Sequence, residues 1–178
     1  MARGSAQRGA VEQRAQQLPV THWTLLRTLR WPGSPDRRID EVLVGPCGVQ
    51  VVLHWPGRLT STTSGGTEVA RLEEAADSAA AAALAVADLL PDRYRRVVTG
   101  AVCLINTVDV GLSVGAVLAA SPDVLQHSWR HQPRVLSTSE AEATALRLRA
   151  TLEPFPVETD PSRGAPWWGW RRLWWRGR

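Results

Sequence analysis

The sequence predicts an α/β protein in which a mixed central β-sheet is flanked by helices. Short apolar runs rich in β-branched residues, bounded by Gly and Pro, occur on both sides of one long segment at residues 68–90. Apolar residues in that segment recur at spacings of three and four, the period of a helix that buries one face. A helix that joins two strands crosses over the sheet, and further helices toward the C-terminus can cover its other face.

Several segments carry the strand pattern, and turn residues separate them. Residues 31–36 form a turn cluster, and Gly45-Pro46-Cys47-Gly48 predicts a second, tight turn. In the first strand, one alternating face is expected to carry Trp23, Leu25 and Leu29. In chain order the expected strands are 22–31, 39–44, 49–53, a short edge strand at 58–63, 97–105, and a strand pair or Gly-broken strand at 110–119.

Helices are expected at residues 10–18, 68–90, 122–131 and 137–152. Ser121-Pro122 is a typical helix start, with the serine as N-cap and the proline at the first position. Ser137 or Ser139 is expected to cap the last helix, in which Leu146 and Leu148 should lie near the core.

Positive charge is concentrated at the C-terminal end of the chain. The 178 residues include 21 arginines, no lysine and 17 acidic residues, for a formal net charge of +4. Residues 161–178 contain five of the arginines and no acid, which leaves 16 arginines against 17 acids elsewhere. The composition of the remaining chain therefore does not indicate a nucleic-acid-binding face.

The cysteines and the lack of long apolar runs suggest that the protein is cytoplasmic. Cys47 and Cys103 lack the spacing of a metal site, so we expect two free thiols in a reducing cytoplasm, with a disulfide as the alternative. Residues 1–17 contain no apolar core of a signal peptide. No run reaches the roughly 18 apolar residues that a transmembrane helix needs. We therefore expect a cytoplasmic protein, which its C-terminus could attach peripherally to a membrane.

Residues 154–178 combine a Pro-rich link with a basic, Trp-rich tail (residues 166–178). Five of the nine tryptophans lie in this tail, interleaved with arginines. Indole prefers the headgroup zone of a bilayer, where arginine meets anionic lipid. The same residue types stack on unpaired bases and contact phosphate, so nucleic acid is a second expected partner. A third interpretation is a tail that folds back or stays disordered. The expected contact residues are Trp167, Trp168, Trp170, Arg171, Arg172, Trp174, Trp175 and Arg176.

A series of motifs between residues 31 and 60 carries a family resemblance. In order, the motifs are Pro32-Gly33, Ile39-Asp40, Val44-Gly45-Pro46, Gly48-Val49, Val51-Val52, Trp55 and Gly57. This order resembles the core of the nuclease-related domain (NERD) family, a branch of the restriction-endonuclease-like nucleases. The resemblance implies a restriction-endonuclease-like fold over residues 9–153, preceded by a flexible N-terminus at residues 1–8.

The resemblance also implies the plan of a metal-dependent active site. In such nucleases two acidic residues hold a divalent metal such as Mg²⁺, and a lysine helps to activate the attacking water. Asp40 matches the first acid, and Glu12 matches a glutamate that the family's first helix brings near the active site. This chain departs from the family pattern at three points. Glu41 replaces the histidine that follows this Asp in the family, and Leu53 stands near the place of the second acid. The chain also has no lysine. Arginine cannot replace lysine in proton transfer, because guanidinium stays charged.

These departures lead us to expect a pseudoenzyme that has lost nuclease activity, needs no metal cofactor and acts as a binding or regulatory module. The first alternative is a divergent DNA nuclease that uses Mg²⁺ with Asp40, Glu12 and either His54 or Glu41. The second alternative is a peripheral membrane protein whose domain only carries the tail.

Two further pairs of residues have a functional and a structural interpretation. Arg37 and Arg38 precede Asp40 and could grip a phosphate, or they could form a solvated loop end. His127 and His131 are four residues apart on an expected helix, which suits half a metal site, but surface histidines are the preferred interpretation.

Overall fold

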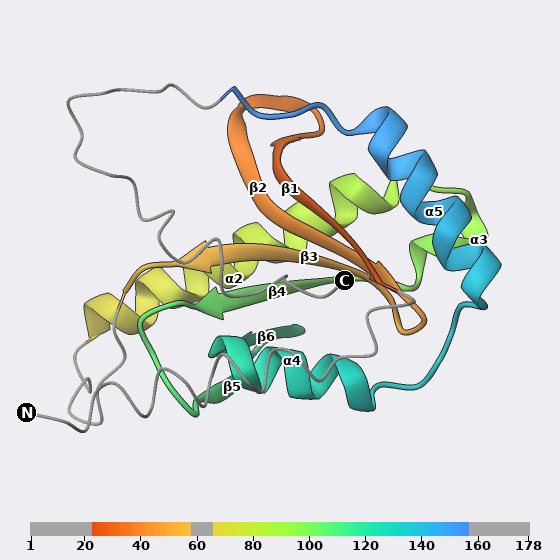
Figure 1. Cartoon of the computed structure of the whole chain (residues 1–178). Coiled ribbons are helices and arrows are strands. Elements are labelled where there is room, and N and C mark those ends of the chain that lie inside the picture. The colour runs from red at the N-terminus through yellow and green to blue at the C-terminus, as the bar shows by residue number, and fades with distance from the viewer. Residues whose placement is uncertain (1–22, 58–65, 157–178) are drawn as a thin grey trace, which may run out of the picture. The chain divides into compact units, whose positions relative to one another are not determined.

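The structure is a computed structural model that describes residues 23–57 and 66–156. In these residues six strands form one mixed sheet in the order β1-β2-β3-β4-β6-β5 (Figure 1). The strands are β1 Thr24–Trp31, β2 Ser34–Gly45, β3 Gly48–Trp55, β4 Val98–Leu104, β5 Gly111–Val114 and β6 Val117–Ala120. The helices described are α2 Gly66–Ala87, α3 Asp92–Arg95, α4 Pro122–His131 and α5 Thr138–Thr151. The expected α/β class with a mixed sheet is therefore confirmed.

The sheet combines an antiparallel meander with a parallel centre. β1, β2 and β3 run antiparallel to one another, β4 and β6 lie parallel to β3, and β5 pairs antiparallel with β6 at the far edge. α2 connects β3 to β4, its parallel neighbour, as the sequence predicts. α2 and α5 pack on the face that carries Val42 and Val51, whereas α4 packs on the opposite face with Leu43 and Val52 (Figure 1).

α2 lies close to the sheet because its buried stripe is mostly alanine. Ala76, Ala79 and Ala82 are at most 2% exposed. Opposite them on β4 is Gly100, where a Cβ atom would lie 2.6 Å from the carbonyl oxygen of Ala79. Small residues on both sides of this contact therefore set the distance between the helix and the strand.

The tight turn at 45–48 occurs where the sequence predicts it. Residues 46–47 connect β2 to β3, and Gly45 pairs with Gly48 at the base of the turn. At Gly48 φ is +113°, and a Cβ atom would lie 2.4 Å from the carbonyl oxygen of Val97, so this position requires glycine. A turn at residues 115–116 separates β5 from β6, so of the two alternatives at 110–119 the strand pair is confirmed.

Regular alternation breaks down in β1, which corrects the predicted face. Trp23 and Leu25 share a face and pack against the cluster of Leu43 and Val52, as predicted, but Leu29 lies on the opposite face with Leu26. Thr28 interrupts the alternation, because its φ of 52° lies in the left-handed region that β-branched residues rarely adopt. The carbonyl oxygen of Thr28 accepts a hydrogen bond from the backbone N–H of Phe155 at 2.8 Å, so the segment after α5 supports this bend.

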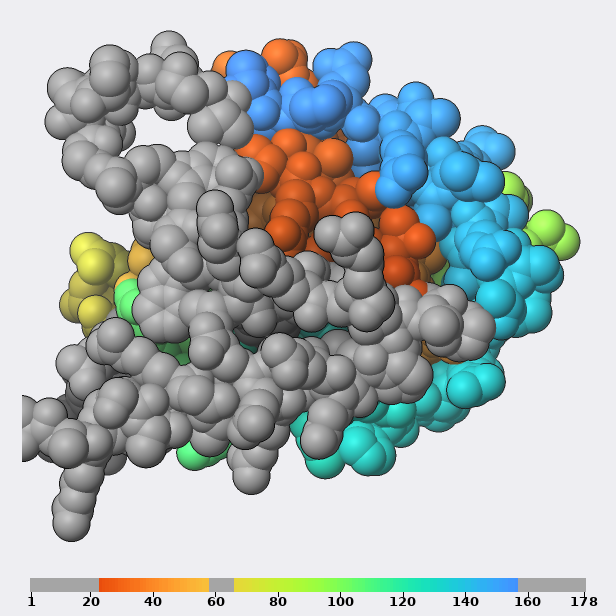
Figure 2. All heavy atoms as spheres, in the orientation of Figure 1, coloured from red at the N-terminus to blue at the C-terminus, as the bar shows by residue number. Residues whose placement is uncertain are grey.

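The segment that follows α5 lies along the outer edge of β1. Pro154 forms a bridge with Leu29, and the backbone N–H of Arg30 donates to the carbonyl of Glu153 at 2.8 Å. The first residues of the predicted Pro-rich link therefore pair with the sheet. In Figure 2 side chains of β1 form part of the visible surface beside those of α5.

β2 starts earlier than predicted, which shortens the turn before it. The strand begins at Ser34, so the predicted turn cluster 31–36 is reduced to residues 32–33. Arg37 and Arg38 consequently lie within a strand. The interpretation of these arginines as a loop end is therefore wrong.

α4 begins at Pro122 and Ser121 is its N-cap residue, as predicted, but the serine side chain makes no capping hydrogen bond. Its hydroxyl forms hydrogen bonds with the backbone of Val110 and does not cap the helix. The serine is fully buried, and this contact joins the start of α4 to the chain just before β5. Leu125 and Trp129 then anchor α4 on the sheet.

α5 has a complete capping box, which assigns the cap to Ser137. The Ser137 hydroxyl accepts a hydrogen bond from the backbone N–H of Glu140, and the Glu140 carboxylate accepts one from the N–H of Ser137. The prediction for Leu146 is wrong, because this residue is 65% exposed while Leu148 is fully buried. Residues that are two positions apart in a helix point about 200° away from each other around the axis, so Leu146 and Leu148 cannot face the core together.

Some predicted segments lie outside the described residues: the helix at 10–18, the edge strand at 58–63 and the tail at 166–178. The short helix α3 has no counterpart among the predictions. Among residues 23–57 and 66–156, no helix is long and apolar enough to cross a bilayer.

Candidate functional site: a polar network between β2 and β3

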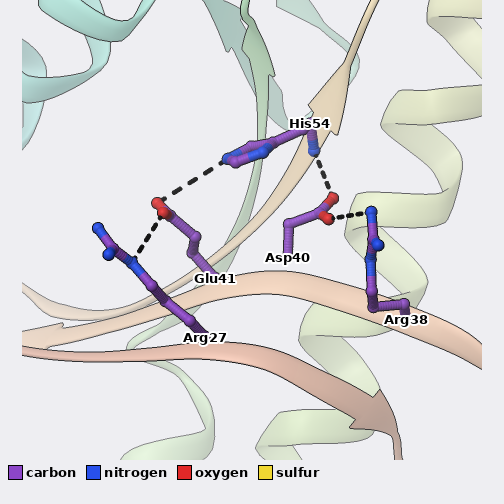
Figure 3. A network of polar contacts seen from close by, with 5 residues as sticks. All are labelled: Arg27, Arg38, Asp40, Glu41 and His54. Atoms are coloured by element: carbon purple, nitrogen blue, oxygen red, sulfur yellow. Dashed lines mark hydrogen bonds and ion pairs between the residues drawn. The ribbon is translucent and has the colours of Figure 1, made fainter. Parts of the chain in front are cut away.

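β2 and β3 separate at the residue that the motif singles out. Their ladder ends at Glu41 and Val52, and the next residue of β2 is Asp40. The backbone N–H of His54, beyond this ladder, donates a hydrogen bond to Oδ2 of Asp40 at 2.8 Å (Figure 3). The Asp40 carboxylate thus takes the place of a strand carbonyl, because a backbone donor in a partly buried position requires an acceptor.

The second oxygen of Asp40 also has a partner. Nη2 of Arg38 lies 2.7 Å from Oδ1, and the Asp40 side chain is 10% exposed (Figure 3). Charge-assisted contacts of this length are stronger than neutral hydrogen bonds, and partial burial limits their screening by water. Asp40 therefore fixes the end of β3 and neutralises Arg38 with its two oxygens.

Glu41 links three strands through a second set of contacts. Its Oε1 lies 3.3 Å from Nε of Arg27, its partner on β1, and its Oε2 lies 3.9 Å from Nε2 of His54 on β3 (Figure 3). Burial raises the pKa of the Glu41 carboxyl, while His54 and Arg27 act in the opposite direction. The carboxylate is thus partly desolvated between two basic side chains.

Among the described residues, Asp40 does not belong to a group of three potential metal ligands. Leu53, near the expected place of the second acid, packs against the apolar clusters under α2. No three His, Cys, Asp or Glu side chains among the described residues gather closely enough to hold a metal ion. Glu12 lies outside these residues. Mg²⁺ is usually held by one or two carboxylates and several waters, so a site that Asp40 shares with Glu12 stays a prediction.

Arg37 and Arg38 have different partners within the domain. The guanidinium of Arg37 lies 3.7 Å from the centre of the Trp31 ring, and its Nη2 donates a hydrogen bond to the Ser78 hydroxyl on α2 at 3.2 Å. Arg38 pairs with Asp40. A phosphate contact by either arginine stays a prediction, and the phosphate would compete with these partners.

Both cysteines are buried free thiols, as expected from the sequence. Burial raises the pKa of Cys47 to about 11 and that of Cys103 to about 12, and the nearby carboxylates of Glu41 and Asp40 add to the second shift. Cys103 is aligned with His54 on the adjacent parallel strand. Because both thiols keep their protons at neutral pH, neither has the thiolate character of a nucleophile.

The two histidines on α4, His127 and His131, contact each other. The rings of His127 and His131 stack with centroids 4.1 Å apart, and Nδ1 of His131 lies 2.7 Å from the carbonyl oxygen of His127. Both residues are exposed. Within the described part of the chain they gain no third ligand, so the arrangement favours surface histidines.

Sequence reasoning missed the contacts of Glu41 with Arg27 and His54. A signal for one of them was present: the turn at 45–48 fixes the register, which puts Glu41 opposite Val52, and His54 lies two residues further on the same face. No comparable signal fixes the register of β1, so Arg27 could not be paired from sequence.

Comparisons with protein-family models, curated proteins and solved structures found no match to this chain. The fold and the site define an α/β protein with an ion-pair network where the strands of its mixed sheet separate. The predicted contact residues Trp167, Trp168, Trp170, Arg171, Arg172, Trp174, Trp175 and Arg176 lie outside the described residues.

Proposed function

We propose that this chain is a nuclease-related domain of the restriction-endonuclease-like class that has lost nuclease activity and acts as a binding or regulatory module. The motif order from Pro32-Gly33 to Gly57 supports the family. The helix that crosses over between β3 and β4 also supports it, because the resemblance implies such a helix between strands.

The state of Asp40 carries the proposal that activity is lost. A divalent ion at this carboxylate would compete with the Arg38 guanidinium at 2.7 Å and the His54 N–H at 2.8 Å, and the positive guanidinium would repel it. It would then find Leu53 at the expected place of the second acid, and the chain has no lysine for the water-activating step. The repulsion from Arg38 would therefore be offset by few new ligands.

The proposed partners of the module are anionic. The tail at 166–178 supports nucleic acid or an anionic membrane surface, because it joins tryptophan to arginine without any acid. We place such a module in the cytoplasm, with peripheral contact to the membrane as one mode of action.

A cleavage assay tests the loss of activity. Full-length protein would be incubated with single-stranded or double-stranded DNA and Mg²⁺ or Mn²⁺, beside an Asp40→Ala variant. We expect no cleavage above that of the variant with either metal. Cleavage that disappears in Asp40→Ala would overturn the proposal and favour the divergent nuclease, in which Glu12, Glu41 or His54 completes the site with Mg²⁺.

A further inference from the structure

The ribbon formed by β1 and β2 turns over in its middle. Leu26 and Leu29 are three residues apart on β1, yet both side chains belong to the same buried cluster. Regular alternation would put them on opposite faces of the sheet. Their partners on β2 belong to that cluster too, so the whole ribbon twists between the two leucines. The residues of this twist are Arg27 and Thr28 on β1 and Asp40 and Glu41 on β2.

The twist strains the backbone at Thr28. The φ of 52° lies in the left-handed region, and a residue in such a conformation keeps it only where the surrounding structure holds it. The neighbouring residue, Arg27, contacts Glu41 at 3.3 Å, and the position across from Thr28 in the register is that of Asp40. A change of the backbone at Thr28 would therefore reach both carboxylates of the polar network.

Residues Glu153–Phe155, which we call the latch, hold this bend from the outer edge of β1 (Figure 1). The backbone N–H of Phe155 donates a hydrogen bond to the carbonyl oxygen of Thr28 at 2.8 Å. Two residues further along β1, the N–H of Arg30 donates to the carbonyl oxygen of Glu153, also at 2.8 Å. Two backbone hydrogen bonds thus join the latch to β1, and one of them ends on the strained residue.

The latch itself is held by few contacts. Glu153 and Pro154 are exposed, and Phe155 is half-buried. The ion pair between Arg30 and Glu153 spans 3.8 Å between exposed side chains, and such pairs contribute little to stability. Segments with few buried contacts open at low cost while the rest of a protein stays folded. The latch can therefore leave β1 without unfolding the domain.

We propose that the latch controls the conformation of the polar network. Docked on β1, it keeps Thr28 bent and Arg27 on Glu41; released, it lets the bend relax and the network loosen. Because the chain continues from the latch into the Pro-rich link and the tail, binding to the tail could act on the network through it. The latch is inferred from contacts within the domain, so it depends neither on the loss of nuclease activity nor on the partner of the tail.

Hydrogen exchange of single backbone amides, measured by nuclear magnetic resonance in full-length protein, tests the latch. The reporter is the amide of His54, which donates to Asp40 in the network. The reference is the amide of Ser121, which donates to the carbonyl oxygen of Val110 beside β5, at the opposite edge of the sheet from β1. A local effect of the latch changes exchange at the reporter alone, whereas a general loss of stability changes both amides.

Two substitutions at Phe155 separate its N–H from its side chain. Phe155→Pro removes the N–H that bonds to Thr28, whereas the matched control Phe155→Leu keeps it together with an apolar side chain. We expect Phe155→Pro to speed exchange at His54 about fivefold, the scale of one lost hydrogen bond, and Phe155→Leu to change it less than about twofold. No acceleration in Phe155→Pro, or the same acceleration in Phe155→Leu or at Ser121, would overturn the proposal.

Thr28→Gly tests whether the latch acts through the bend. Glycine adopts a positive φ without steric strain, so the bend should no longer need the latch. In this background we expect Phe155→Pro to change exchange at His54 less than about twofold. A fivefold acceleration that persists with glycine at this position would overturn the bend as the link between the latch and the network.

Discussion

Asp40 accepts the His54 backbone N–H at 2.8 Å and the Arg38 guanidinium at 2.7 Å from a side chain that is only 10% exposed. Removing the carboxylate leaves two donors without their acceptor. We expect Asp40→Ala to lower the free energy of unfolding by about 2–3 kcal/mol in urea denaturation, and Asp40→Asn to cost less because its amide oxygen still accepts one bond. The exposed Asp36→Ala is the control, with an expected change within about 0.5 kcal/mol. Equal effects at both positions would contradict a structural role for Asp40.

Glu41 should make stability depend on pH in a defined direction. Burial raises its pKa above the ordinary value of 4.5, so the folded state binds more protons than the unfolded state between 4.5 and the raised value. Stability from this group is therefore present below 4.5 and is lost as pH rises through the folded pKa. Relative to wild type, Glu41→Gln should gain stability as pH rises from below 4.5 to neutrality. Urea denaturation at several pH values measures this difference, and a difference that does not change with pH would contradict it.

The candidate site was only partly predictable at the level of residues. Asp40 stands out because it follows Ile39 at the start of a recognisable motif. Arg38 lies two residues before Asp40 on β2, so strand alternation alone puts both side chains on one face, but the pair was missed because the strand was expected to begin only at residue 39. The contact of Arg27 with Glu41 depends on the register between β1 and β2, which no short turn fixes.

At the level of elements, the contact between α2 and β4 depends on a glycine. A Cβ atom at Gly100 would lie 2.6 Å from the carbonyl oxygen of Ala79, so Gly100→Ala must push the helix away from the strand. We expect a loss of about 1–3 kcal/mol in urea denaturation, the usual cost of overpacking. Gly66→Ala is the control, because nothing lies within 4 Å of a Cβ atom there. If Gly100→Ala were as stable as this control, the close approach of α2 would be contradicted.

Elements with strong local signals were predictable, and those shaped by distant contacts were not. The turn at 45–48 and the start of α4 at Pro122 follow from Gly and Pro, whose backbone preferences act locally. The bend at Thr28 has no local signal, because the bond from Phe155 that supports it comes from the far end of the domain. The hydroxyl of Ser121 is likewise drawn from its predicted cap position by the backbone of Val110.

At the scale of the whole molecule, the separation of charge between the domain and the tail predicts how the chain meets membranes. Deleting residues 164–178 removes four arginines and five tryptophans and leaves a chain with 17 arginines and 17 acidic residues. We expect full-length protein to co-sediment with vesicles that contain anionic lipid, more weakly at high salt, and the shortened chain to remain in solution. Vesicles of neutral lipid are the control. Undiminished binding of the shortened chain would exclude the tail as the membrane contact.

Metal binding at Asp40 tests the central claim most directly, because it does not depend on finding a substrate. Electron paramagnetic resonance would measure bound Mn²⁺ in full-length protein and in Asp40→Asn at increasing metal concentration. If the carboxylate is held by Arg38 and His54, both proteins should lack a saturable site below about 1 mM and give the same titration. A tighter site that is present in the wild type and absent from Asp40→Asn would contradict the claim and show that the carboxylate holds a metal.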